Sequence, residues 1–150
     1  MEIRGFKAFF PGLKTLEQDM ILIVGKTYHN NEPIRFNKNG FHFCKRLEDT
    51  LHFFAGYEGD IDICEVIGYG TISEFSNDYY GYYDMYAASD IKIVKKLSKI
   101  EILNMYKELL RDAQVNQNRI SRFLHYYPNL NEEDYKYLGA TPKQYPLRLY

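Results

Sequence analysis

The stretch "DIKIVKKLSKIEILNMYKELL", residues 90–110, contains two hydrophobic periods, and the change between them decides the fold class. In its first eight residues, 90–97, Ile91 and Ile93 alternate with the polar Lys92. Alternation of apolar and polar side chains is typical of a β-strand that buries one face. The stretch therefore begins as a strand.

The second half of the stretch changes to helical spacing at Ser98. The segment "SKIE" is a capping box, in which the Ser98 hydroxyl accepts from the Glu101 amide and the Glu101 side chain reaches back. Behind it an apolar stripe recurs at helical spacing: Ile102, Leu103, Tyr106, Leu109, Leu110 and Ala113. A second, shorter helix is predicted after Asn131, its N-cap. We expect a helical region over residues 98–138 and an extended tail over residues 139–150.

The chain before this helix is rich in strand and turn signals. A short helix is expected near residues 46–55, where apolar residues fall at helical spacing. Strands come first and helices follow, an order typical of α+β proteins. We therefore predict a single α+β domain over residues 1–150, with a β-rich part over residues 1–97. Its mostly antiparallel, twisted sheet is expected to contain about six strands within residues 3–97, at 3–10, 20–25, 32–36, 41–44, 60–70 and 90–97.

Composition limits the classes of function that this chain can have. Lys and Arg number 19 and Asp and Glu number 20, so the formal net charge is −1. Such a balance gives no overall attraction to nucleic acid or to an anionic membrane. No apolar run reaches the ~20 residues of a membrane-spanning helix, and the first residues lack a secretion signal. We expect a cytoplasmic protein in which Cys44 and Cys64 are free thiols.

The segment "NGFHFCK", residues 39–45, places His42 and Cys44 on one face of a predicted strand. Their spacing matches no common zinc pattern, so no metal is expected. As a nucleophile, Cys44 would gain from the nearby helix start, with His42 as its base. Side chains two apart on a strand are separated by roughly 6–7 Å, too far for a direct hydrogen bond. Both residues are catalytic candidates, and the expectation is that they form the wall of a sheet.

Glu65 shares its predicted strand face with Ile61, Ile63 and Ile67. A carboxylate on an apolar face is partly desolvated, which raises its pKa or requires a cationic partner. Arg4, Lys7 and Arg35 are the candidates for that partner. Glu65 is therefore either a general base or the acidic half of a structural ion pair, and the residues alone leave both readings open.

A cluster of tyrosines follows Asn77. It comprises five residues within eight positions: Tyr79, Tyr80, Tyr82, Tyr83 and Tyr86. Tyrosine combines a large apolar ring with a polar tip, which suits protein recognition. The neighbouring Asp78 and Asp84 would repel phosphate, so a protein partner is preferred to nucleic acid. The alternative is a tyrosine-lined hairpin that packs on its own domain.

Five segments of the chain resemble a family of small phage and bacterial α+β domains of unknown activity. The resemblance implies a compact α+β domain and lends no reaction, and the helical region from Ser98 onward lies outside it. The matching segments are "FKAF" at 6–9, "VGKTY" at 24–28, "NGFHFCK" at 39–45, "CEVIGYG" at 64–70 and "IKIV" at 91–94.

A more remote likeness is to ADP-ribosyltransferases, whose NAD pocket combines a basic first strand, an aromatic strand entering a helix, and a glutamate. That likeness implies a pocket lined by Arg4, His42 and Glu65, with NAD as the cofactor. The late catalytic glutamate of those enzymes has no match here, because Glu65 comes too early and Glu101 caps a helix.

Two functions from different classes follow from these observations. The first is a protein-binding or inhibitory domain without a cofactor, which acts through the tyrosine-rich loop and the C-terminal helices. The resemblance to phage domains makes a phage–host interaction the expected setting. The second is a small NAD-using transferase. Because no complete catalytic set can be assembled from the sequence, protein binding is the preferred hypothesis.

Overall fold

The computed structural model of the chain places most of its residues. It describes residues 1–16, 19–35, 38–51, 54, 57, 59–77, 83–112, 124, 127 and 130–139.

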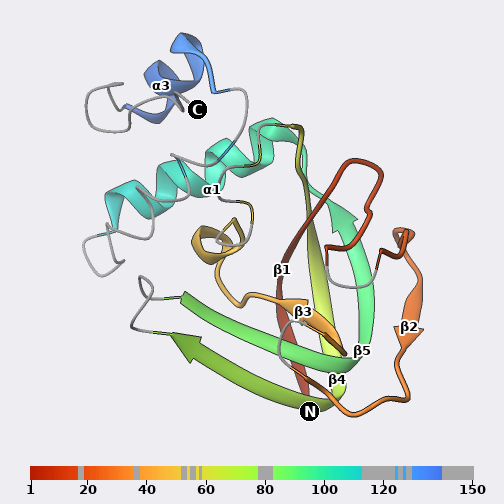
Figure 1. The fold of residues 1–150 in the computed structure, drawn as a ribbon. Coiled ribbons are helices and arrows are strands. Elements are labelled where there is room, and N and C mark those ends of the chain that lie inside the picture. The colour runs from red at the N-terminus through yellow and green to blue at the C-terminus, as the bar shows by residue number, and fades with distance from the viewer. Residues whose placement is uncertain are drawn as a thin grey trace.

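The chain forms strands first and helices afterwards, as the sequence predicts for an α+β protein (Figure 1). Five strands form one sheet, where about six were expected. The elements are β1 (Glu2–Phe9), β2 (Thr27–His29), β3 (Phe41–Phe43), the 3-10 turn η1 (Leu47–Asp49), β4 (Asp62–Asn77), β5 (Tyr83–Lys96), α1 (Lys99–Arg111) and α3 (Glu132–Leu138).

The sheet is built around the long β4–β5 ribbon, and every strand pair in it is antiparallel. The strand order is β1-β4-β5-β2, and β3 also pairs with β5. Two of the longest strands are therefore neighbours both in sequence and in space, and the shorter strands are added at their edges (Figure 1).

Two irregularities bend β4. Its register with β5 shifts between Glu65 and Val66 and again between Tyr69 and Ile72. Gly70 lies inside the second shift with a φ of 81°, a left-handed conformation that glycine adopts without strain. Because bulges bend a strand and increase its twist, the second half of β4 turns away from β1 (Figure 1).

Residues 20–25, which the sequence predicts as a buried strand, form no strand. Their backbone bonds to the preceding loop: the Leu22 amide donates to the Leu13 carbonyl at 3.0 Å, and the Thr15 amide to the Met20 carbonyl at 2.8 Å. Leu22 is buried, but its apolar neighbours are exposed: Met20, Ile21, Ile23 and Val24. A short apolar run does not reveal which of its residues will face the core, and here only one does.

Two other segments are less regular than expected. Within 32–36, the described residues contain one isolated bridge, between Arg35 and Asn39. Within 46–55, the described part contains the 3-10 turn η1, which the Thr50 hydroxyl closes by donating to the Leu47 carbonyl at 2.8 Å, and Phe54 is again in 3-10 conformation. Within the described residues, two of the six predicted strands are thus not formed, and β2, which the sequence did not predict, brings the number of strands in the described sheet to five. The predicted helix is shortened to 3-10 turns.

The capping box predicted at Ser98 is present. The Ser98 hydroxyl accepts from the Glu101 amide, and the Glu101 carboxylate accepts from the Ser98 amide, both at 3.2 Å. Asn131 and Asp134 form the same arrangement at the start of α3. Neither of these two described helices has the length and apolar character needed to cross a membrane.

Both faces of the sheet bury apolar side chains. On β1 and β4, neighbouring residues alternate between the two sides, as the pleat requires: Ala8 and Ile63 face one cluster, Phe9 and Cys64 the other. The helix-side cluster also contains Leu47, Leu51, Leu97, Ile102, Leu103 and Tyr106. The β3-side cluster also contains Phe41, Phe43, Val66, Ala88, Ile91 and Ile93.

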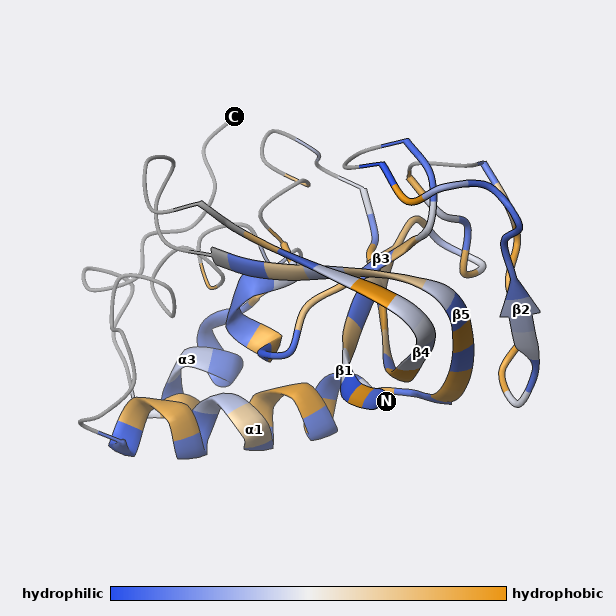
Figure 2. Ribbon diagram, turned by 90° about the horizontal axis from the view of Figure 1, so that it is seen from below, coloured by the Kyte–Doolittle hydropathy of each residue, from blue (hydrophilic) through white to orange (hydrophobic). Residues whose placement is uncertain are grey.

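The apolar residues of α1 that enter the helix-side cluster lie on one stripe of the helix. Figure 2 shows hydrophobic and hydrophilic residues alternating along α1, which lies beside the sheet. Ile102, Leu103 and Tyr106 are its buried residues, at the i, i+1, i+4 spacing that puts side chains on one side. Burial of this stripe against the sheet is what holds α1 in place.

Candidate functional site

The outer half of the β4–β5 ribbon, residues 72–77 paired with residues 83–88, carries the tyrosine cluster. The pairing is regular from Ile72 opposite Ala88 to Asn77 opposite Tyr83. The segment that holds Tyr79, Tyr80 and Tyr82 therefore starts and ends at the tip of this ribbon, and these tyrosines lie outside the described residues, as does the side chain of Tyr83.

Tyr86 packs on its own domain. Its ring stacks on Phe43, with centroids 5.7 Å apart and an interplanar angle of 25°. Burial raises the pKa of Tyr86, and the nearby carboxylates of Glu74 and Asp84 raise it further. Tyr86, one of the five tyrosines predicted to bind a partner, thus packs against Phe43 of its own domain in the outer half of the ribbon.

The tip of the ribbon is fastened to η1. The Asp84 amide donates to Oδ2 of Asp49 at 3.2 Å, and Asp49 is almost fully buried at 1% exposure. A buried carboxylate that accepts from a backbone amide is a strong, directional contact. Together with the stack of Tyr86 on Phe43, it fixes β5, the strand that follows the tyrosine-bearing segment in the chain.

Among the described strands, none covers the outer half of β4 on the side that faces away from β5, and this side is called its open edge. β1 pairs with β4 only over residues 62–69, and no other described strand pairs with β4 on that side. Glu74, in the middle of this edge, is exposed. An open strand edge presents backbone donors and acceptors that another extended chain can bind.

His42 and Cys44 line a cavity between β1 and β3. β3 joins β1 where Phe6 and Cys44 exchange two backbone hydrogen bonds of 2.7 and 2.8 Å. The cavity has a volume of about 270 Å³. The ten residues that line it are Phe6, Lys7, Ala8, Leu16, His42, Phe43, Cys44, Thr50, Phe54 and Met85.

The cavity wall is apolar with a few polar groups. The Lys7 ammonium group donates to the His42 carbonyl at 2.6 Å and lies 5.5 Å from the centre of the Phe9 ring. The His42 imidazole approaches the Gly40 carbonyl through Nδ1 at 3.2 Å, and this contact requires Nδ1 to carry a hydrogen, since a carbonyl oxygen only accepts. Cys44 packs against Met85. The sequence offered His42, Cys44 and the basic Lys7 of the first strand as candidates, but it did not show that the three line one cavity.

The other two candidate catalytic residues lie elsewhere. Arg4 is exposed on β1 opposite Ile67, and Glu65 is half-buried opposite Phe6. Arg4 and Glu65 are diagonal neighbours on the same face of the sheet, but neither lines the cavity that holds His42. The structure thus brings His42 and Cys44 to one site and places Arg4 and Glu65 at another.

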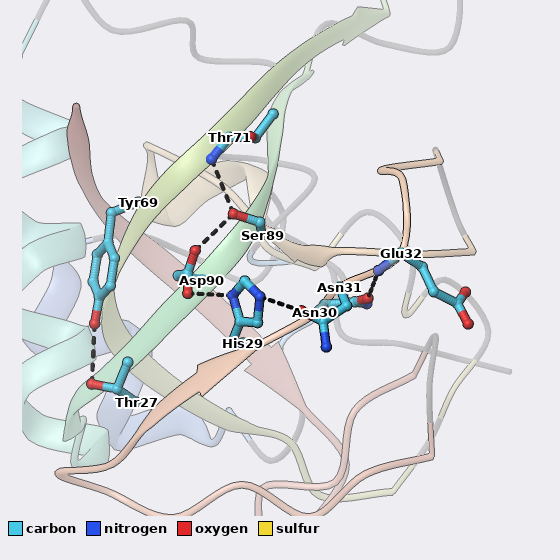
Figure 3. A network of polar contacts seen from close by, with 9 residues as sticks. All are labelled: Thr27, His29, Asn30, Asn31, Glu32, Tyr69, Thr71, Ser89 and Asp90. Atoms are coloured by element: carbon cyan, nitrogen blue, oxygen red, sulfur yellow. Dashed lines mark hydrogen bonds and ion pairs between the residues drawn. The ribbon is translucent and has the colours of Figure 1, made fainter.

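A polar network across β2 and β5 was not predicted from the sequence (Figure 3). His29 Nδ1 lies 2.7 Å from Oδ1 of Asp90, and its Nε2 lies 2.6 Å from Oδ1 of Asn31. Since both ring nitrogens face acceptor oxygens, the imidazolium form satisfies both contacts. The hydrogen bond to Asp90 is the largest cause of a raised His29 pKa, followed by the bond to Asn31.

Ser89 extends this network toward β4. Its hydroxyl donates to Oδ2 of Asp90 at 2.7 Å and accepts from the Thr71 amide at 3.0 Å. The bond from Ser89, and then the one from His29, holds the pKa of the Asp90 carboxyl below its ordinary value. The adjacent Ser89-Asp90 pair is visible in the sequence, but its link to His29 depends on a cross-strand register that no local pattern encodes.

Within the part of the chain that the structure describes, no three His, Cys, Asp or Glu side chains are grouped so that they could hold a metal ion. Burial raises the pKa of the Cys64 thiol to about 12, and the charge of Asp62 adds to this effect. Both cysteines are free and buried. Cys64 is thus a protonated core residue.

Comparison with known proteins places the chain in a family. No curated protein and no solved structure matches it. Residues 3–105 match the family described as "Domain of unknown function (DUF7666)". The match includes the whole described sheet and the first half of α1, and on this evidence the chain belongs to the DUF7666 family.

Proposed function

We propose that this protein is a non-enzymatic protein-binding domain whose recognition element is the outer half of the β4–β5 ribbon. The observation that carries the proposal is that the two strands flanking the tyrosine-rich segment in the sequence pair as far as Asn77 and Tyr83, and that no described strand covers the other edge of β4 there. Tyrosine-rich loops on a rigid scaffold offer large contact areas at a low cost in conformational entropy.

Preorganisation of the ribbon supports this function. Asp49 holds the Asp84 amide, and Phe43 holds the Tyr86 ring. Both contacts are made without a partner, so the entropy of ordering the strand is lost on folding and not on binding.

The charges of the outer half favour a protein partner over nucleic acid. Its described charged residues, Glu74 and Asp84, are both acidic, and they would repel a phosphate backbone. The resemblance to phage and bacterial domains makes a host or viral protein the expected class of partner. Two free thiols, Cys44 and Cys64, fit a reducing compartment such as the cytoplasm.

The NAD-using transferase is the alternative, and the geometry gives it less support. The cavity beside His42 has about 270 Å³, below the roughly 300–1,000 Å³ of sites for drug-sized ligands. Arg4 and Glu65 are outside its wall. A thermal shift with NAD tests this alternative directly, because a ligand that binds only the folded state raises its melting temperature.

Affinity capture tests the protein-binding proposal. The immobilised wild type is compared with the quadruple variant Y79S/Y80S/Y82S/Y83S in host lysate. Proteins that bind the wild type are expected to be lost from the variant, because serine removes four rings and their contact area. A quadruple Tyr→Phe variant keeps the rings and is expected to retain part of the capture.

Matched controls make this experiment decisive. Tyr137→Ser removes an exposed tyrosine on α3, away from the ribbon, and its capture should equal that of the wild type. Circular dichroism must show that the quadruple variant folds. Full capture by the folded quadruple variant would show that the tyrosines do not bind the partner.

A further inference from the structure

The hydrogen bond from Asp84 reveals which backbone groups face the open edge of β4. The Asp84 amide donates to Asp49 and so points away from β4. Asp84 lies opposite Ser76. In an antiparallel pair, hydrogen-bonded and non-hydrogen-bonded positions alternate. Ser76 therefore occupies a non-hydrogen-bonded position toward β5, and its own amide and carbonyl face the other way.

The alternation extends along the rest of the outer half. Register is unbroken from Ile72 to Asn77, so Ile72 and Glu74 have the same orientation as Ser76. The pairing of β3 provides an independent check. The amide and carbonyl of Cys44 bond to Phe6 on β1, so those of the preceding Phe43 face β5, where they meet Tyr86, which shares the parity of Asp84. Three consecutive outward positions of β4, residues 72, 74 and 76, thus present their amides and carbonyls to the open edge.

This edge carries few of the features that usually prevent pairing. Proteins guard exposed edges with Pro, Lys or a bulge within the strand. The segment "TISEFSN", residues 71–77, has neither Pro nor Lys, and the register shift lies before Ile72. Residues 71–77 span about three and a half two-residue repeats of a strand, which is long enough to pair with a short extended segment.

Charge indicates what kind of segment fits this edge. Glu74 is exposed at its centre, and Asp84, at the same parity on β5, lies on the same face of the ribbon. If two copies of the chain paired symmetrically about Glu74, like charges would lie directly opposite each other, which is destabilising. A segment with Lys or Arg opposite Glu74 instead gains a favourable cross-strand pair.

We infer that the partner binds by strand addition: an extended, basic segment of a protein pairs with residues 72–76 of β4. The inference rests on the proposed function and specifies its binding mode. The outward amides and carbonyls of residues 72, 74 and 76 form the new ladder, and Glu74 selects a basic side chain.

Two synthetic peptides test strand addition on the full-length protein: an eight-residue peptide of alternating Thr and Lys, and its Thr–Glu counterpart. Amide hydrogen exchange is measured by NMR. In the free protein, exchange is expected to be fast at residues 72, 74 and 76 and slow at residues 73 and 75. The Thr–Lys peptide should slow exchange at the three outward positions, and the Thr–Glu peptide should not.

Two substitutions at one position separate backbone pairing from charge. Glu74→Pro removes one outward amide and leaves the ladder to β5 intact, since proline is tolerated where the amide faces solvent at an edge. It should weaken binding of the Thr–Lys peptide about tenfold, by losing a hydrogen bond and obstructing the edge. Glu74→Gln keeps the amide and should reduce only the preference for Lys over Glu. Circular dichroism and the melting temperature confirm that both variants fold.

Several outcomes would overturn strand addition. It is wrong if Glu74→Pro binds the Thr–Lys peptide as well as wild type, or if neither peptide protects the three amides. Protection in the free protein that disappears on dilution would show that a second copy occupies the edge. Protection that persists at all concentrations would show that the chain covers its own edge. If the tyrosine variant loses capture while Glu74→Pro retains it, the proposed function stands and strand addition fails.

Discussion

At the scale of single residues, protonation is controlled by contacts between strands. His29 on β2 and Asp90 on β5 face each other across the sheet, and each stabilises the charged form of the other (Figure 3). Cys64 shows the opposite effect, because burial and the charge of Asp62 outweigh the charge of Lys96 and favour its neutral thiol. The same sheet therefore stabilises the charged forms of His29 and Asp90 and the neutral form of the Cys64 thiol.

The His29 pair predicts a pH dependence. The His29 pKa in the folded protein lies above the ordinary 6.5, so its contribution to stability is complete below that ordinary value and is lost as pH rises through the raised pKa. NMR titration of the imidazole should show the raised value, and Asp90→Asn should lower it. An unchanged His29 pKa in that variant would mean that Asp90 is not the cause.

The Cys64 thiol predicts alkaline destabilisation. Its pKa rises from 9.0 to about 12 on folding, so the free energy of unfolding should fall as pH increases from 9 toward 12. Urea denaturation at several pH values measures this slope. Cys64→Ala should reduce it and leave the part that comes from Tyr127, whose pKa is also raised to about 12. Equal slopes in the two proteins would contradict the assignment to Cys64.

At the scale of elements, the approach of β3 to the sheet depends on glycine. A Cβ at Gly68 on β4 would lie 2.4 Å from the Phe43 ring, and one at Gly5 on β1 would lie 2.3 Å from the Cys44 carbonyl oxygen. Both positions must therefore lack a side chain for β3 to pack where it does. This packing also places Phe43 under Tyr86 at the base of the outer half of the ribbon.

The contact between Gly68 and Phe43 predicts a coupled pair of substitutions. Gly68→Ala should destabilise the protein by about 1–3 kcal/mol, the usual cost of overpacking a core. In a Phe43→Leu background Gly68→Ala should lower the stability by less, because leucine lacks the ring atoms that the new Cβ would meet. A double-mutant cycle from urea denaturation measures the coupling, and strictly additive effects would show that the ring is not what Gly68 accommodates.

At the scale of the whole molecule, β1 and β4 connect two apolar clusters. Each strand contributes alternate residues to both clusters. Loss of packing in either cluster would therefore disturb β1 and β4, which the other cluster also needs. The helix-side cluster is covered by α1, and the β3-side cluster by β3 and the loop that carries Leu13 and Leu22. This sharing is the physical basis for expecting the β-rich part and the first helix to behave as a single domain.

Cooperativity of unfolding tests that expectation. Ile102→Ala in the helix-side cluster and Ile91→Ala in the β3-side cluster should each cost about 2–4 kcal/mol. In both variants, circular dichroism and tyrosine fluorescence should report one coincident transition. Two separate transitions in the Ile102→Ala protein would place a domain boundary near Ser98.

The sequence alone determined the features that depend on local patterns. Alternation at Ile91 and Ile93, and the capping box at Ser98, are encoded within a few residues, so the order of strands and helices and the α+β class followed directly. Burial of Phe41 and Phe43 was also predictable from their alternation. The tyrosine cluster was visible as composition, although the sequence did not show that Tyr86 would pack on Phe43.

Only the tertiary structure decided the features that depend on pairing and register. The exposure of Ile21, the meeting of His29 with Asp90, and the open edge around Glu74 all depend on which strands become neighbours and how far each pairing extends. A strand's period is a property of its own residues, whereas its register is set by contacts with residues distant in the chain. For that reason local patterns gave the elements of this protein, and packing gave its candidate binding edge.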